Sequence, residues 1–384
     1  MSTSNISGNK REFLEYILTF WSSITWIYGS YILVRSVIYY KGIDVTVGFI
    51  CFLSMSVGVF LSSLVKDSRI LNAIPFLQAS LQFLLCYNNM FEKPFYLMIL
   101  SATTGAFAPH YLAPLLLETS IENRGRRTAI VVFLSILTIL FGYFMTATYG
   151  ARVFLLACFR LITYPFVKKT SEILEGRPKE REIEYRSRES VLYLSSILIF
   201  FFVDILVFQV YLMKYPATLL DLLFWFKYIP ASMVIPLIGY VIDSLGRKGA
   251  ILLTMLGLAF SNIVLTIFPT SIETLITYSL LDGVVWGSLT LIYYFVIWGD
   301  LLDGKKFLER YSYVLSILYV TEGASYYIAT YLATLPPHQL YLFSSLLIII
   351  SIILLWFAQE TLPYEIRERR RLYRYIKEAR RLKN

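Results

Sequence analysis

Charged residues are scarce in this chain of 384 residues. Asp, Glu, Lys and Arg together make up 16% of it, whereas a soluble domain usually carries about 25%. Hydrophobic residues make up 57% of the chain. The shortage of charge argues against an ordinary soluble domain and predicts a membrane protein.

Cysteine and histidine are also rare. Cys51, Cys86 and Cys158 fall inside apolar runs without paired spacing, so neither a disulfide framework nor a thiolate metal site is expected. The two histidines, His110 and His338, are too far apart in the sequence to suggest a metal site. A Gly-x4-Gly-Lys-Ser/Thr loop is absent, so direct ATP hydrolysis is not expected. The sequence therefore predicts no metal and no cofactor.

The apolar residues form long continuous runs that do not alternate with a period of two, which favours helices over a barrel. A helix needs roughly 20 apolar residues to cross the hydrocarbon core of a bilayer. We therefore predict an all-α membrane protein with twelve transmembrane helices near 14–39, 45–65, 70–88, 95–117, 128–148, 150–168, 190–213, 218–242, 249–268, 273–298, 309–334 and 338–358.

Lys and Arg in the connecting segments indicate the orientation, because cytoplasmic loops carry an excess of both. The loops predicted to lie outside hold only Lys41, Lys93, Arg152 and Lys214. Both termini are therefore predicted to be cytoplasmic in a cell membrane. The net charge of +9 follows from this topology, so nucleic acid is not an expected partner. The basic tail is expected to form a helix near anionic lipid.

Segment 169–189 is the one long polar interruption, and it divides the predicted helices six and six. The stretch GYVIDSLGRK at 239–248 aligns without gaps with GVFLSSLVKD at 58–67, at the equivalent place in each half. NRGRR at 123–127 and LDGKK at 302–306 also correspond. We therefore expect two pseudo-symmetric six-helix bundles, 14–168 and 190–358. They are joined by a cytoplasmic linker, 169–189, and flanked by an N-terminus, 1–13, and a tail, 359–384.

The loop at 239–248 has the pattern of glycine, three residues, aspartate, two residues, then glycine and two basic residues. In Gly239, Asp243, Gly246, Arg247 and Lys248 the chain resembles the major facilitator superfamily. The resemblance implies that Asp243 latches the cytoplasmic face when the carrier opens outward, through a helix N-terminus or a basic partner. Gly239 would allow close helix packing and Gly246 a tight turn.

Two further segments carry the resemblance. PLLLETSIENRG at 114–125 is similar to the Pro…Glu…Arg-Gly segment of sugar porters and related metabolite carriers, with Glu118, Arg124 and Gly125 at the matching positions. AQETLP at 358–363 is similar to the Pro-Glu-Thr ending of the last helix, with Gln359 in place of the proline.

The chain also departs from the family pattern. Ser62 stands where the first loop copy would have an aspartate, and Ser101 stands where many proton-driven relatives have an arginine. The first predicted helix lacks the aspartate that proton-coupled sugar porters use. Neither proton coupling nor a sugar solute therefore follows from the resemblance.

Charged residues inside the predicted helices are candidates for function, because a charge at the bilayer centre costs at least about 2.5–3.5 kcal/mol. In the resembled family the first, fourth, seventh and tenth helices line a central cavity. Most of the candidates fall on those helices, with others on the eighth and eleventh. The predicted substrate and ion pathway comprises Tyr31, Arg35, His110, Asp204, Tyr211, Lys227, Asp282, Trp286 and Glu322.

Each candidate also has a structural interpretation. Arg35 lies near the outer end of its helix and could extend its charge to the interface. His110 fits an interior histidine with satisfied hydrogen bonds, and either aspartate could form a packing ion pair with Lys227. Arg160 lies inside a helix that usually flanks the cavity, so structural and functional roles both stay open for it.

These features predict a secondary transporter that moves a small polar solute, such as a sugar or organic acid, by alternating access. A coupling proton or cation and a monomeric carrier are expected. Export of a hydrophobic compound, or a receptor without transport activity, is the alternative. An enzyme is not predicted, because the outer loops are too short to build a catalytic site.

Overall fold

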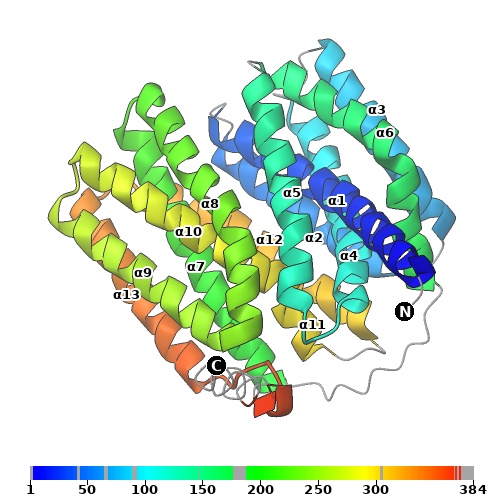
Figure 1. Cartoon of the computed structure of the whole chain (residues 1–384). Coiled ribbons are helices and arrows are strands. Elements are labelled where there is room, and N and C mark those ends of the chain that lie inside the picture. Colours follow the sequence, from blue (N-terminus) through cyan, green and yellow to red (C-terminus); the bar gives the residue numbers. More distant parts are fainter. Residues whose placement is uncertain are drawn as a thin grey trace.

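The apolar runs form helices in the computed structural model, which describes residues 3–40, 44–64, 68–88, 93–146, 148–175, 187–302 and 306–366, with Glu368, Arg369 and Leu372. Within these ranges the chain contains helices and no strand (Figure 1). The prediction of an all-α protein is confirmed for this part of the chain. Lys41, the middle of the predicted linker (176–186) and the tail from residue 373 lie outside the described residues.

The helices follow the predicted runs closely. The first half contains α1 (Thr3–Tyr40), α2 (Val45–Leu64), α3 (Ser68–Asn88), α4 (Pro94–Glu118), α5 (Arg124–Met145) and α6 (Tyr149–Glu175). The second half contains α7 (Ser187–Lys214), α8 (Ala217–Leu245), α9 (Arg247–Ile267), α10 (Ile272–Phe295), α11 (Ile297–Leu301), α12 (Phe307–Leu332) and α13 (Pro337–Phe357).

Several boundaries differ from the sequence prediction. Helix α1 begins at Thr3, whereas the first predicted helix begins at residue 14. The run at 273–298 is divided at Val296, whose φ of −125° and ψ of −57° separate α10 from the short α11. Helix α6 continues to Glu175 and α7 begins at Ser187, so both ends of the predicted linker 169–189 are helical.

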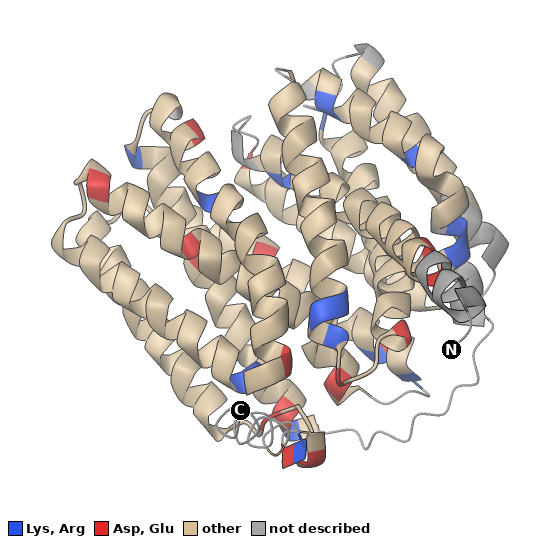
Figure 2. Ribbon diagram, in the orientation of Figure 1, with Lys and Arg blue, Asp and Glu red and all other residues tan. Residues whose placement is uncertain are grey.

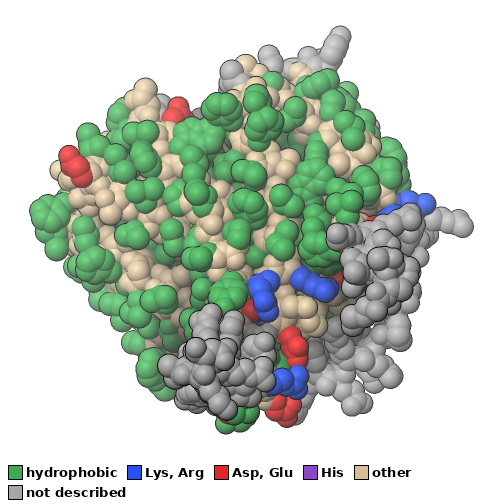
Figure 3. All heavy atoms as spheres, in the orientation of Figure 1, with side chains coloured by type: hydrophobic (Ala, Val, Ile, Leu, Met, Phe, Trp, Pro, Cys, Tyr) green, Lys and Arg blue, Asp and Glu red, His purple; other side chains and the backbone are tan. Residues whose placement is uncertain are grey.

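Among the described residues, eight helices are long and apolar enough to cross a membrane: α1 (over Glu12–Ile38), α2, α5, α7, α8, α9, α10 with α11, and α13. Their outward-facing side chains are hydrophobic, as at Phe144, Leu253 and Trp356, which are 73%, 69% and 69% exposed. Figure 3 shows hydrophobic side chains over most of the visible face. The chain is therefore an integral membrane protein, and α3, α4, α6 and α12 remain predicted spans.

The most extensive packing between the two halves of the chain is that of α2 against α12 and of α5 against α8. Within the halves, α2 packs on α4 and α8 packs on α10. Glycine permits the close approach in both cases: a Cβ at Gly105 would collide with the backbone of Met55, and one at Gly283 with that of Lys227. The repeat seen in the sequence thus has a counterpart in the packing.

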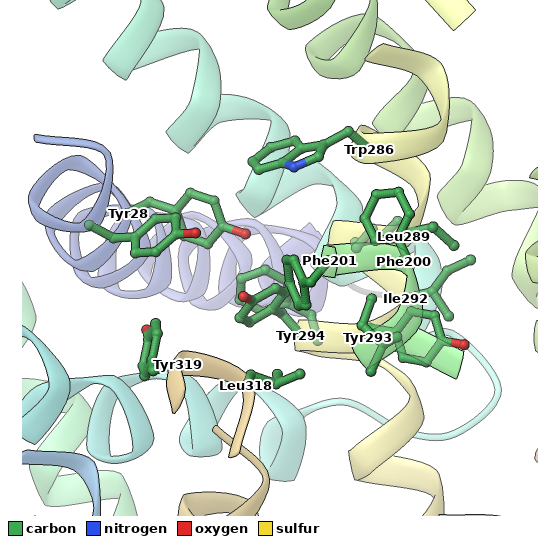
Figure 4. Packing of buried hydrophobic residues seen from close by; sticks show 14 of the residues in the cluster. Tyr28, Phe200, Phe201, Trp286, Leu289, Ile292, Tyr293, Tyr294, Leu318 and Tyr319 are labelled. Atoms are coloured by element: carbon green, nitrogen blue, oxygen red, sulfur yellow. The ribbon is translucent and has the colours of Figure 1, made fainter. Parts of the chain in front are cut away.

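Aromatic side chains from both halves of the chain pack together in the core (Figure 4). The ring of Tyr294 on α10 lies 6.2 Å from those of Tyr28 on α1 and Phe201 on α7. Tyr319 on α12 lies 6.0 Å from Tyr31 on α1. We call Tyr28, Phe201, Tyr294 and Tyr319 the aromatic layer. All four are buried, and Tyr294 lies near the end of α10 that meets α11.

Candidate functional site

Figure 2 shows charged residues at positions midway along several helices. Some of their side chains, from both halves of the chain, form ion pairs with one another. Arg35 on α1 contacts Asp204 on α7 at 3.3 Å and Glu322 on α12 at 3.4 Å. Tyr31, one helical turn before Arg35 and on the same face, donates its hydroxyl to Glu322 at 2.6 and 2.7 Å. All four side chains are buried. Arg35 is therefore held between carboxylates and does not extend to the membrane surface.

Lys227 on α8 extends this network within the second half. Its Nζ lies 2.5 Å from Asp204 Oδ1 and 2.8 Å from Asp282 Oδ2 on α10. The other oxygen of Asp282, Oδ1, is buried and has no hydrogen-bond partner among the described residues. We call Tyr31, Arg35, Asp204, Lys227, Asp282 and Glu322 the central network. Removing one partner of a buried ion pair typically costs about 3–5 kcal/mol, so these groups depend on one another.

A small cavity adjoins the central network. It leaves about 50 Å³ for water-sized molecules, and a drug-sized ligand needs roughly 300–1,000 Å³. The cavity therefore has room for a few waters and must widen to admit a metabolite. Its walls contain Arg35, Asp204, Lys227 and Asp282 beside aromatic and small side chains, among them Phe208, Tyr211, Phe224, Tyr228, Tyr278 and Ser279.

The structure brings together most of the residues predicted for the pathway. Tyr211 lines the cavity, and Trp286 lies beside it against Tyr228, with ring centroids 5.6 Å apart. His110 lies apart from the network, and its Nε2 is 2.9 Å from the backbone oxygen of Ser62. This contact fits the structural alternative for His110, an interior histidine whose hydrogen bonds are satisfied by the protein.

Arg160 also lies apart from the cavity. Its guanidinium donates to Ser30 and to the carbonyl of Trp26, and it stacks over the Trp26 ring at 4.4 Å. None of the carboxylates in the described part of the chain pairs with it. Its contacts join α1 to α6.

A second polar cluster lies at the end of the bundle where α4 turns into α5 and α8 into α9. Asp243 accepts the backbone N–H groups of Gly125 at 3.0 Å and Arg126 at 2.9 Å, in the first turn of α5. The unpaired N–H groups there make a helix N-terminus favourable for a carboxylate. Gly239 packs directly on Gly125, where a side chain would separate the helices. Asp243 thus joins α8 of one half to α5 of the other.

Arginines and a second aspartate complete this cluster. Asp300 on α11 pairs with Arg124 and, at 3.0 Å, with the fully buried Arg247. Arg247 also donates to the backbone oxygen of Ile121 at 2.7 Å, across the boundary between the halves. We call Arg124, Asp243, Arg247, Asp300 and Glu360 the end cluster.

Glu360 stabilises the turn between α8 and α9. It accepts the backbone N–H groups of Arg247 at 2.9 Å and Lys248 at 3.1 Å, at the start of α9. Gly246 has a φ of +109°, a backbone conformation in which any residue with a side chain would be strained. Lys248 donates to the carbonyls of Trp356 and Ala358 at 2.8 and 2.7 Å and so caps the end of α13.

The remaining motif residue, Glu118, is half-buried at the last position of α4. Sequence reasoning missed Asp300, Glu360, Phe224 and Tyr228. For Glu360 the available signal was its place in AQETLP, and for the two aromatic residues it was their position around Lys227 on α8.

Comparison with known proteins adds evidence on the fold. No protein-family model matches the chain, and no curated protein matches it by sequence. Among solved structures it is similar to the proton:xylose symporter XylE of the major facilitator superfamily, bound to 6-bromo-6-deoxy-D-glucose. The TM-score is 0.62 at 14% identity, over 92% of this chain and 97% of that one. It is also similar to the human organic anion transporter MFSD10 (TETRAN), with a TM-score of 0.55 at 12% identity, over 89% and 97%. The chain therefore has the fold of the major facilitator superfamily transporters.

Proposed function

We propose that the protein is a secondary transporter that moves a small polar solute across a cell membrane by alternating access. The observation that carries the proposal is the central network: ionisable side chains from both halves of the chain converge, buried, beside a cavity. Charges inside a membrane protein are costly and typically mark solute or ion pathways. In this proposal the bundles 14–168 and 190–358 rock about the network, with both termini in the cytoplasm.

The end cluster supports the same proposal. It joins the halves at one end, together with the aromatic layer, while the cavity lies on the other side of that layer. Such a structure is closed at the end-cluster side, and a carrier must break these contacts to open there. Solute and coupling ion would change which side is open by binding the two conformations unequally.

The charged side chains in the cavity wall favour a polar or charged solute over the alternative of a hydrophobic compound for export. Buried charges must be compensated, and an apolar solute offers no compensation. The names of the similar structures make sugars and organic anions the first solutes to test, together with organic cations.

The test is uptake into proteoliposomes of labelled solutes under an imposed proton or sodium gradient. Uptake of at least one solute is expected, and Asp204→Asn should reduce it at least tenfold, because Arg35 and Lys227 lose their shared partner. Asp221→Asn is the matched control, since Asp221 is an exposed aspartate at the start of α8. Equal uptake by wild type and Asp204→Asn would show that the central network is not the pathway.

A further inference from the structure

Asp282 lines the cavity, and one of its carboxylate oxygens is an unsatisfied acceptor. One of its carboxylate oxygens is 2.8 Å from Lys227 Nζ, and the other has no hydrogen-bond partner within the described residues. The residue is 4% exposed. A buried acceptor without a partner costs about 1–3 kcal/mol, and more when it carries charge. Asp282 is therefore suited to receive a donor or a cation from a ligand.

The charges of the central network lead to the same conclusion. Its three carboxylates, on Asp204, Asp282 and Glu322, share two cations, on Arg35 and Lys227. Each cation already contacts two carboxylates. With every group ionised, the network has one negative charge in excess, and an uncompensated buried charge costs several kcal/mol. One monovalent cation at Asp282 would balance it, whereas an anionic ligand would increase the excess.

The walls of the cavity favour an organic cation over a metal ion. Tyr211 and Tyr278 lie edge to face with centroids 6.1 Å apart, and Phe224 lies 4.4 Å from Tyr228. Aromatic faces attract ammonium groups through the ring quadrupole. No group of three or more His, Cys, Asp or Glu side chains suited to a metal occurs in the described part of the chain.

We propose that the solute is an organic monovalent cation, an ammonium compound whose charged group binds at Asp282 between these two aromatic pairs. This inference rests on the proposed transport function, and it specifies the class of solute. The cavity in its present form is too small for such a compound. The ligand therefore binds when the cavity widens, with Asp282 as the fixed anchor.

The test is direct binding to purified protein in lipid nanodiscs, measured by calorimetry. The probes are methylammonium, choline and phenethylammonium, with 3,3-dimethylbutan-1-ol as the uncharged isostere of choline and succinate as an anion. At least one ammonium compound should bind, and choline should bind at least tenfold more tightly than its isostere. Asp282→Asn should remove this preference, and the exposed-site variant Asp221→Asn should retain it.

A second variant keeps the test decisive if Asp282→Asn does not fold. Tyr278→Leu removes one aromatic face and leaves every carboxylate in place, so ammonium binding should weaken about three- to tenfold. Tighter binding of succinate or of the isostere, no binding by any ammonium compound, or an unchanged choline preference in Asp282→Asn would each overturn the proposal.

The two proposals fail separately. Choline binding that depends on Asp282, without uptake of any solute into liposomes, would refute transport and leave the cation site standing. Gradient-driven uptake of an uncharged or anionic solute, without ammonium binding, would refute the cation site and leave transport standing.

Discussion

Replacing Asp243 with asparagine should open the end-cluster side of the protein. The Asp243 carboxylate accepts two backbone N–H groups from the first turn of α5 and lies 3.4 Å from Arg126 Nε. Hydrogen bonds to a charged group contribute about 1.5–3 kcal/mol each. Asparagine keeps one carbonyl oxygen as a neutral acceptor and loses the charge. We therefore expect a loss of about 2–3 kcal/mol from the closed state, which corresponds to roughly a 30- to 150-fold shift toward the open state.

The assay is maleimide labelling of a single cysteine placed at Leu318, with Cys51, Cys86 and Cys158 replaced by alanine. Leu318 is buried between the halves close to the aromatic layer, so its labelling requires opening (Figure 4). When opening is rapid and reversible, the labelling rate is proportional to the open fraction. Asp243→Asn should therefore raise the rate by roughly 30- to 150-fold.

Two controls sharpen this measurement. Ser62 occupies the equivalent position in the first half, but its hydroxyl donates to Val59 of its own helix at 2.7 Å, so Ser62→Ala should label at the wild-type rate. Phe60 on α2 packs on Tyr313 on α12 at 6.0 Å. Cysteines placed at these two positions and joined by a bifunctional thiol crosslinker should return Asp243→Asn to slow labelling. Equal rates in wild type and Asp243→Asn, or equal acceleration by Ser62→Ala, would refute an asymmetric latch.

Three other predictions use different readouts. Arg247→Gln removes the fully buried guanidinium that pairs with Asp300, so the protein should unfold at lower temperature. The labelling rate of the cysteine at Leu318 should rise at least as much as in Asp243→Asn. Gly105→Val should destabilise the folded protein by about 3 kcal/mol or more in a denaturant titration, because the α2 backbone occupies that space. Gly257 faces open space and valine has the better helix propensity, so Gly257→Val should change the stability by less than about 1 kcal/mol. Lys227→Met should abolish uptake, and adding Asp282→Asn should restore thermal stability in part, since it removes the carboxylate left without a partner.

The sequence was sufficient to predict the helices because a long apolar run has one stable form in lipid. Every backbone group must be paired within the segment, and a helix does this. The break at Val296 could not be predicted, because the surrounding residues remain apolar and no proline marks it. The break depends on how these residues pack against the rest of the protein, and it sets the position of Asp300 on α11.

Sequence spacing predicted which side chains share a face of one helix, and it could not predict which faces meet. Tyr31 and Arg35 are one turn apart, so their common face followed from the sequence. Their partner Glu322 is 291 residues beyond Tyr31, and the contact depends on how α1 packs against α12. His110 fitted the same polar pattern, but its nitrogen is used by a backbone oxygen of α2.

The central network forms a continuous route from the cavity to the contact between the halves. Asp282 contacts Lys227, Lys227 contacts Asp204, and Asp204 contacts Arg35, which is the one charged member supplied by the first half. A cation bound at Asp282 would compete with Lys227 for that carboxylate. The Lys227 ammonium group would then interact mainly with Asp204. Arg35 would then be held less strongly by the second half, which favours separation of the halves. If this reasoning is right, a bound ammonium compound changes the labelling rate of the cysteine at Leu318 in the wild-type network, and Lys227→Met removes that response. A response that persists without Lys227 would mean that the signal reaches the boundary by another route.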